Sequence, residues 1–202
     1  MVSQVSDLYR LIEYCIGDKY TNFSLLDLGC GKGLYGYVIR SVFGFKVKLV
    51  GVDIKFERKF IPCLKELYSE LYEEALEDFL FADTFHWDII LAQQVLEHLP
   101  EENALMCMRQ MTKISDYSIV GFPKPQKQYD SKDDRNAHHW GCSDEKLLKV
   151  NYQRVHAITN NHVYIHLKAK DKNLIKHWKV GGDNDSTVLR GDRQFCSIPL
   201  LK

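Results

Sequence analysis

The sequence lacks several features that define specialised protein classes. No apolar run approaches the ~20 residues that a membrane-spanning helix needs. The N-terminal stretch MVSQVSDLYRLIEYCIG has neither the basic start nor the continuous apolar core of a secretion signal. Lysine plus arginine total 27, as do aspartate plus glutamate, so no net charge attracts nucleic acid or a membrane surface. We therefore expect a protein with no membrane partner.

The six cysteines form no C-x-x-C pair, which argues against both a redox motif and a structural zinc site. A chain of 202 residues with 45% hydrophobic residues can bury a core without disulfide bonds. We interpret the cysteines as reduced thiols and expect a cytoplasmic protein. One domain is expected over residues 1–170, followed by a C-terminal extension, 171–202, that is polar and irregular.

Apolar segments of strand and helix character alternate along this domain. Strands are expected at 24–29, 46–54, 86–94 and 117–123, and helices at 5–16, 33–43, 62–76 and 102–114. A polar loop at 124–141 and a short helix at 143–151 follow, and then two strands, 154–159 and 162–170, around an Asn-Asn turn. This order predicts an α/β fold with a Rossmann-like, doubly wound sheet. Most strands are parallel, and the closing hairpin adds an antiparallel strand near one edge.

The stretch LLDLGCGKGLYG, residues 25–36, contains two overlapping glycine patterns. From Gly31 it is G-x-G-x-x-G and ends at Gly36, which is typical of dinucleotide sites. From Asp27 it is D-x-G-x-G-x-G and ends at Gly33. In the first pattern a pyrophosphate lies over the turn, and the Asp27 carboxylate would repel it. An ammonium group explains Asp27 better, so charge favours a nucleoside ligand with an amino-acid head.

The sequence resembles the class I S-adenosylmethionine-dependent methyltransferases. The resemblance spans about residues 23–170 and rests on LLDLGCGKG, VGVDI and WDIILAQQVLEHLP. It implies a seven-stranded sheet with one antiparallel strand, and S-adenosyl-L-methionine as the cofactor across the strand ends. It also implies roles for particular residues. The backbone of four residues would approach the methionine part: Gly29, Cys30, Gly31 and Gly33. Asp53 would hold the ribose, and the adenine would pack on Ile54.

The resemblance also implies an acidic residue after the third strand, contacting the adenine amino group. Two registers are open. Asp78–Phe79 leaves a comfortable connection to the strand at Trp87, whereas Asp83–Thr84 leaves only a few residues, so Asp78 is preferred. Gln93, at the end of the fourth strand, is expected beside the methionine part.

Two histidines are candidates for the methyl-transfer step. His98, in VLEHLP, is a possible base because a neutral imidazole accepts a proton near pH 7. Its alternative role, shared with Glu97, is to brace the helix beside the cofactor. His139 lies in a polar segment that resembles a substrate-side loop, together with Asn136 and Trp140. The neighbouring His138 is an alternative to His139, and a solvated polar loop is the competing interpretation.

We expect transfer to an oxygen or nitrogen nucleophile, with a small molecule as the acceptor. A metal-assisted RNA 2′-O-methyltransferase is an alternative, since Glu97, His98 and His139 resemble part of its metal-binding pattern. Gln94 replaces a glutamate of that pattern, however, and acidic residues offset the basic ones near the loop, so nucleic acid is not favoured and no metal is expected. A non-catalytic module that binds the cofactor is a further alternative, and a nicotinamide enzyme is less consistent with Asp27.

Overall fold

The computed structural model describes residues 8, 11–13, 15–17, 22–123, 139–140, 143–158 and 161–167. The expected extension at 171–202 and most of the expected loop at 124–141 lie outside these residues. Within the expected first helix, the described residues are helical, and Leu8, Leu11 and Ile12 are among those that are buried. No helix of the described part is long and apolar enough to cross a membrane.

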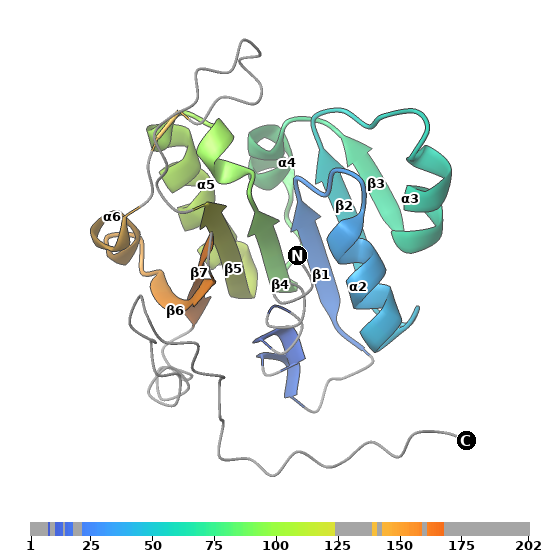
Figure 1. Cartoon of the computed structure of the whole chain (residues 1–202), viewed down its shortest axis with the longest axis horizontal. Helices are drawn as coiled ribbons and strands as arrows, with labels where there is room; N and C mark the ends of the chain where they lie inside the picture. Colours follow the sequence, from blue (N-terminus) through green and yellow to red (C-terminus); the bar gives the residue numbers. More distant parts are fainter. Residues whose placement is uncertain are drawn as a thin grey trace.

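Strands and helices alternate through the described part (Figure 1). The strands are β1 (Ser24–Leu28), β2 (Lys48–Asp53), β3 (Glu70–Glu73), β4 (Trp87–Gln93), β5 (Ser115–Pro123), β6 (Gln153–Ile158) and β7 (Asn161–Leu167). The helices are α2 (Leu34–Phe43), α3 (Ile61–Leu67), α4 (Leu76–Ala82), α5 (Glu101–Ile114) and α6 (Asp144–Leu148), with a short 3-10 turn, η2 (Leu96–His98).

All these strands join one sheet in the order β3-β2-β1-β4-β5-β7-β6. The pairs among β1 to β5 are parallel, whereas β7 runs antiparallel to both β5 and β6. The predicted α/β fold with a mostly parallel sheet is thus confirmed. After β1 the chain builds β2 and β3 on one side and then crosses to β4 on the other. The carboxyl ends of β1 and β4 therefore flank the switch point at which such sheets bind ligands.

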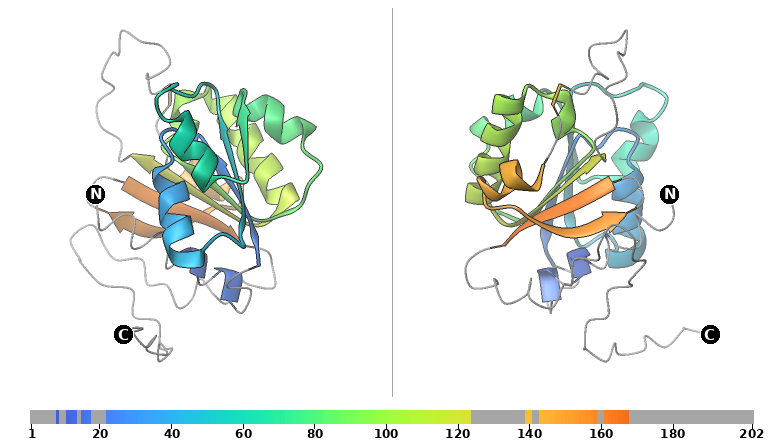
Figure 2. Two further views of the ribbon diagram at one scale, coloured as in Figure 1. Left: turned by 90° about the vertical axis from the view of Figure 1, so that its right-hand side faces the viewer. Right: turned by 60° about the vertical axis from the view of Figure 1, so that its left-hand side comes forward.

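Helices cover both faces of the sheet (Figure 2). Alternate residues of β1 show the division: Leu25 packs with α2 and α3, and Leu26 packs with α4 and α5. The central strands are buried on both faces and are therefore apolar almost throughout. Asp27 is an exception, because it is acidic although only 1% of its surface is exposed.

The expected helix over 62–76 is wrong. Helix α3 ends at Leu67, the edge strand β3 follows, and α4 begins only at Leu76. Strand β3 pairs with β2 in parallel, from Val50 with Glu70 to Asp53 with Glu73. The break in the helix brings Tyr68 and Glu74 into positions that the continuous helix would not give them.

Candidate functional site

The glycine turn follows β1 and has left-handed backbone at Gly29, Gly31 and Gly33. A Cβ atom added to Gly31 would meet only the Gly29 carbonyl oxygen, at 3.9 Å, so the space over Gly31 is open. The backbone N–H groups of Gly29 and Cys30 both donate to the carbonyl of Val52, which fixes the turn against β2. The turn thus offers an open approach at Gly31 on a rigid base.

Asp53, at the end of β2, is joined directly to the glycine turn. Its Oδ2 accepts a hydrogen bond of 2.8 Å from the N–H of Gly31, and its Oδ1 accepts one from Lys55. The next residue, Ile54, leaves 66% of its surface exposed although it is apolar. The strand end therefore presents a carboxylate and an apolar surface side by side, and it places a negative charge at the open edge of the turn.

Asp27 lies beneath the turn, where its Oδ2 accepts a 2.6 Å hydrogen bond from the hydroxyl of Tyr68. Burial raises the pKa of Asp27 to about 7; the bond from Tyr68 opposes this shift, and the nearby Asp53 charge adds to it. Burial likewise raises the pKa of the neighbouring Cys30 thiol. A carboxyl of this kind is sensitive to any positive charge that approaches it.

Two glycines make room for the Tyr68 ring. A Cβ atom on Gly36 would lie 2.5 Å from a ring carbon of Tyr68, and one on Gly51 would lie 2.9 Å from the opposite side of that ring. Gly36 was the last glycine of the dinucleotide pattern. Its packing against Tyr68 explains that glycine without a pyrophosphate.

The structure separates the candidates for the acid after the third strand. Asp78 is exposed on α4, and the adjacent Phe79 is buried against the sheet. Asp83 follows the C-terminus of α4, where it accepts a hydrogen bond from the indole of Trp87. The acid that directly follows β3 is Glu74, whose N–H donates to the carbonyl of Asp53. Sequence reasoning missed Glu74 because it placed this residue within a helix.

The end of β4 carries backbone strain and an unpaired polar atom. Gln94 has a φ of 54°, an uncommon conformation for a residue other than glycine. The side-chain Nε2 of Gln93 is buried and has no hydrogen-bond partner in the described part of the chain. Buried polar atoms are normally paired, so this amide is suited to meeting a ligand.

The turn η2 brings the predicted catalytic candidates together. The N–H of His139 donates to the carbonyl of Glu97, and the indole of Trp140 donates to the carbonyl of Leu96. His98 lies on the same turn. Trp140 is buried and anchors this point of the chain, whereas the His139 side chain is exposed. Asn136 and His138 lie outside the described residues.

Glu97 is a second buried carboxyl, with 2% of its surface exposed. Its Oε2 has no hydrogen-bond partner among the described residues, and burial raises its pKa to about 7. Sequence reasoning treated Glu97 as a brace for the helix. Only the burial shows that it is also suited to accepting a proton near neutral pH.

Within the described ranges, no group of three or more histidine, cysteine, aspartate or glutamate side chains is arranged to hold a metal ion. The described cysteines, Cys15, Cys30, Cys63 and Cys107, form no disulfide bond with one another.

Residues 26–115 match the family model described as a methyltransferase domain. No sequence among the curated proteins matches the chain. The fold is similar to that of a magnesium protoporphyrin IX methyltransferase from Synechocystis PCC 6803, solved with bound S-adenosylhomocysteine (SAH). That match has a TM-score of 0.55 and 14% identity, and it covers 81% of this chain and 83% of the other.

Two further structures are similar. One is a SAM-dependent methyltransferase from Archaeoglobus fulgidus, with a TM-score of 0.58, 15% identity and coverage of 80% of this chain and 91% of the other. The other is an O-methyltransferase family protein from Burkholderia thailandensis, with a TM-score of 0.57, 10% identity and coverage of 82% and 57%. The resemblance to class I S-adenosylmethionine-dependent methyltransferases is confirmed: residues 26–115 match a methyltransferase domain, and the chain has the fold of these similar structures.

Proposed function

We propose that this protein is an S-adenosylmethionine-dependent methyltransferase that acts on an oxygen or nitrogen nucleophile of a small molecule in the cytoplasm. The observation that carries the proposal is the arrangement at the switch point. An open glycine turn, the Asp53 carboxylate and the exposed Ile54 lie beside one another there. These groups suit a ligand with a ribose and an adenine and without a pyrophosphate.

The charges around the turn support this cofactor over a dinucleotide. Asp53 bonds to Gly31 at the open edge, and Asp27 is buried beneath it. The Asp27 carboxylate disfavours a pyrophosphate and favours a ligand that carries an ammonium group, whereas Asp53 would accept hydrogen bonds from the ribose of either ligand. In the proposed complex, the Asp27 carboxylate attracts the ammonium, Asp53 accepts hydrogen bonds from the ribose hydroxyls and Ile54 packs on the adenine.

The remaining contacts follow from the strand ends. The backbone of Gly29, Cys30, Gly31 and Gly33 borders the methionine part, and Gln93 contributes its unpaired amide there. Glu74 directly follows β3, so we propose that Glu74, rather than Asp78, contacts the adenine amino group. Phe79 supports this region from the core and not by direct contact, because its ring is buried.

The bound cofactor supplies a methyl group on a sulfonium, which is already activated for transfer. The chain's own residues then need to align the acceptor, exclude water and remove a proton. Glu97 is suited to removing the proton, because it is buried and its Oε2 has no hydrogen-bond partner in the part of the chain that the structure describes. His98 and His139, on and beside η2, are the alternatives for that role or for contact with the acceptor.

Two experiments test the proposal. Calorimetry of the full chain with SAH and with NAD is expected to detect binding of SAH alone; binding of NAD alone would overturn the cofactor assignment. The chain is then incubated with methyl-labelled cofactor and a fractionated cell extract. We expect label in a small metabolite. Label in RNA would instead support the metal-assisted RNA enzyme, and SAH binding without transfer to any fraction would support a non-catalytic module.

A further inference from the structure

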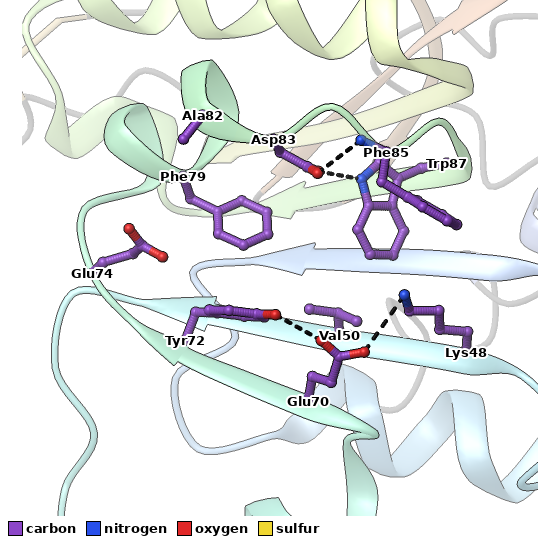
Figure 3. Close-up of a pocket in the computed structure, with 10 residues that line it drawn as sticks. All are labelled: Lys48, Val50, Glu70, Tyr72, Glu74, Phe79, Ala82, Asp83, Phe85 and Trp87. Carbon is purple, nitrogen blue, oxygen red and sulfur yellow. Dashed lines mark hydrogen bonds and ion pairs between the residues drawn. The ribbon is translucent and has the colours of Figure 1, made fainter.

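A cavity of about 260 Å³ lies between α4 and the edge of the sheet formed by β2 and β3 (Figure 3). Its lining includes Lys48, Glu70 and Trp87, the first residues of β2, β3 and β4. The glycine turn lies at the opposite ends of these parallel strands, so most of this cavity is remote from the proposed cofactor site. Sites for drug-sized molecules have volumes of roughly 300–1,000 Å³, so this cavity suits a smaller group.

Aromatic rings form much of the wall. Tyr72 of β3 lies against Phe79 of α4, with 5.0 Å between the ring centroids. Phe85 lies against Trp87 at 4.7 Å. Tyr72 and Phe85 are 37% and 42% exposed, so the rings can be reached from solvent. The close-up shows these two aromatic pairs on the same side of β2 (Figure 3).

These rings already face one ammonium group. The Nζ atom of Lys48 lies 4.4 Å from the centroid of Phe85 and 5.6 Å from that of Trp87. Both distances are within the ~6 Å range of cation–π attraction. The part of the wall beside Lys48 is thus suited to positive charge in the folded protein.

Carboxylates outnumber cations among the lining residues. Glu70, Glu74 and Asp83 face a single lysine, Lys48. The pKa of Glu70 is lowered, chiefly by the hydrogen bond from Tyr72 and also by Lys48, so Glu70 is ionised at neutral pH. The excess of negative charge disfavours an anion and attracts a cation.

Several of the carboxylate oxygens are already engaged. The two oxygens of Glu70 are used by the hydroxyl of Tyr72, at 2.6 Å, and by Lys48, at 3.5 Å. Asp83 accepts hydrogen bonds from the Trp87 indole and from the Phe85 N–H. A primary ammonium needs hydrogen-bond acceptors, whereas a quaternary ammonium needs only ring faces and negative charge.

We propose that this cavity is a second binding site, specific for a quaternary ammonium group. Tyr72 and Phe85 supply the exposed aromatic surface, and Glu70 supplies negative charge. The site does not depend on the proposed methyltransferase activity, because none of these three residues lies at the glycine turn.

Isotope-edited NMR of the full chain tests the proposal. The chain has three tryptophans, so the indole N–H of Trp87 can be followed while the other two indole signals serve as references. We expect choline to produce a saturable shift of the Trp87 signal alone. The uncharged isostere of choline, with carbon in place of the quaternary nitrogen, is expected to bind at least about tenfold more weakly. Equal binding of the isostere, or no saturable shift with choline, would overturn the proposal.

Matched variants locate the site. Glu70→Gln removes the charge with little change of shape, and Phe85→Leu removes a ring face; each is expected to weaken choline binding several-fold. Glu66→Gln and Phe45→Leu change exposed residues elsewhere and are expected to leave it unchanged. Equal loss in the control variants would show that choline does not bind in this cavity.

Discussion

The hydroxyl of Tyr68 lies 2.6 Å from the carboxylate of Asp27, beneath the glycine turn. Asp27 lies one residue before the end of the central strand β1, whereas Tyr68 follows a helix 41 positions later in the chain. The bond is buried, and the space for it is left by glycines at positions 36 and 51. A single contact therefore links the acidic residue of the motif to the packing of α3 against the sheet.

Asp27→Asn is expected to stabilise the fold at pH 8. The pKa of Asp27 is about 7 in the folded chain against an ordinary value of 3.8. Between these two pH values the folded state holds a proton that the unfolded state has lost, and at pH 8 the carboxylate is buried as an ion. Stability therefore falls as pH rises from about 4 to about 7, by up to about 4 kcal/mol from this group. Urea unfolding at pH 5 and pH 8 measures the effect. Glu97 contributes in the same direction, so the variant should reduce the pH dependence without abolishing it.

The same residue is expected to make SAH binding dependent on pH. If the ligand's ammonium requires ionised Asp27, the binding-competent fraction falls to about a tenth at pH 6, and the dissociation constant rises about tenfold between pH 8 and pH 6. Calorimetry at the two pH values provides the measurement. Asp27→Asn should weaken binding at pH 8 and remove the difference. An unchanged affinity in that variant would contradict the role given to Asp27.

Gly36→Ala is expected to destabilise the fold by about 1–3 kcal/mol through overpacking against Tyr68. Alanine otherwise favours a helix over glycine by about 1 kcal/mol, so the sign of the change is informative. In a Tyr68→Leu background the same substitution should cost less, because the ring is absent. Denaturant unfolding of the two single variants and the double variant gives the coupling. Additive effects would show that Gly36 is not required by the ring.

Glu74→Ala is expected to weaken SAH binding about tenfold, the value of one good hydrogen bond to the ligand. Asp78→Ala is the matched control, since its side chain is exposed on α4, and it should leave the affinity within about twofold. The reverse ranking, measured by calorimetry, would restore the register preferred from the sequence.

Glu97→Gln is expected to lower the rate of methyl transfer by about 10²–10⁴-fold while leaving SAH affinity nearly unchanged. The substitution keeps the shape of the side chain and removes its capacity to accept a proton. Glu102→Gln, on the exposed face of α5, is the control. Single-turnover rates with the acceptor identified by labelling provide the test. A rate equal to that of the unsubstituted chain would leave His98 or His139 as the base.

The central strands and the glycine turn could be predicted from the sequence because their signals are local. SLLDL and WDIILAQ are mostly apolar, with one acidic residue each, which is typical of parallel strands covered on both faces. Asp53 was placed correctly at the end of β2 for the same reason. These segments predict a site at the switch point from local signals alone.

Strand β3 could not be predicted in this way. Leu64, Leu67, Tyr68 and Leu71 recur at helical spacing, so local periodicity favours one long helix. The strand forms because residues 70–73 pair with β2, a contact that no local pattern shows. The positions of Tyr68 and Glu74 depend on that break. Likewise, His139 lies beside Glu97 because of a hydrogen bond between residues that are 42 positions apart in the chain.

The hydrogen bonds from His139 and Trp140 to η2 hold these two residues, which follow β5 in the sequence, against the segment that follows β4. Residues 124–138 thus lie between Pro123 and these two hydrogen bonds in the sequence. The same two bonds tie the candidate bases on η2 to the segment that follows β5, so a displacement of Trp140 would also displace Glu97 and His98.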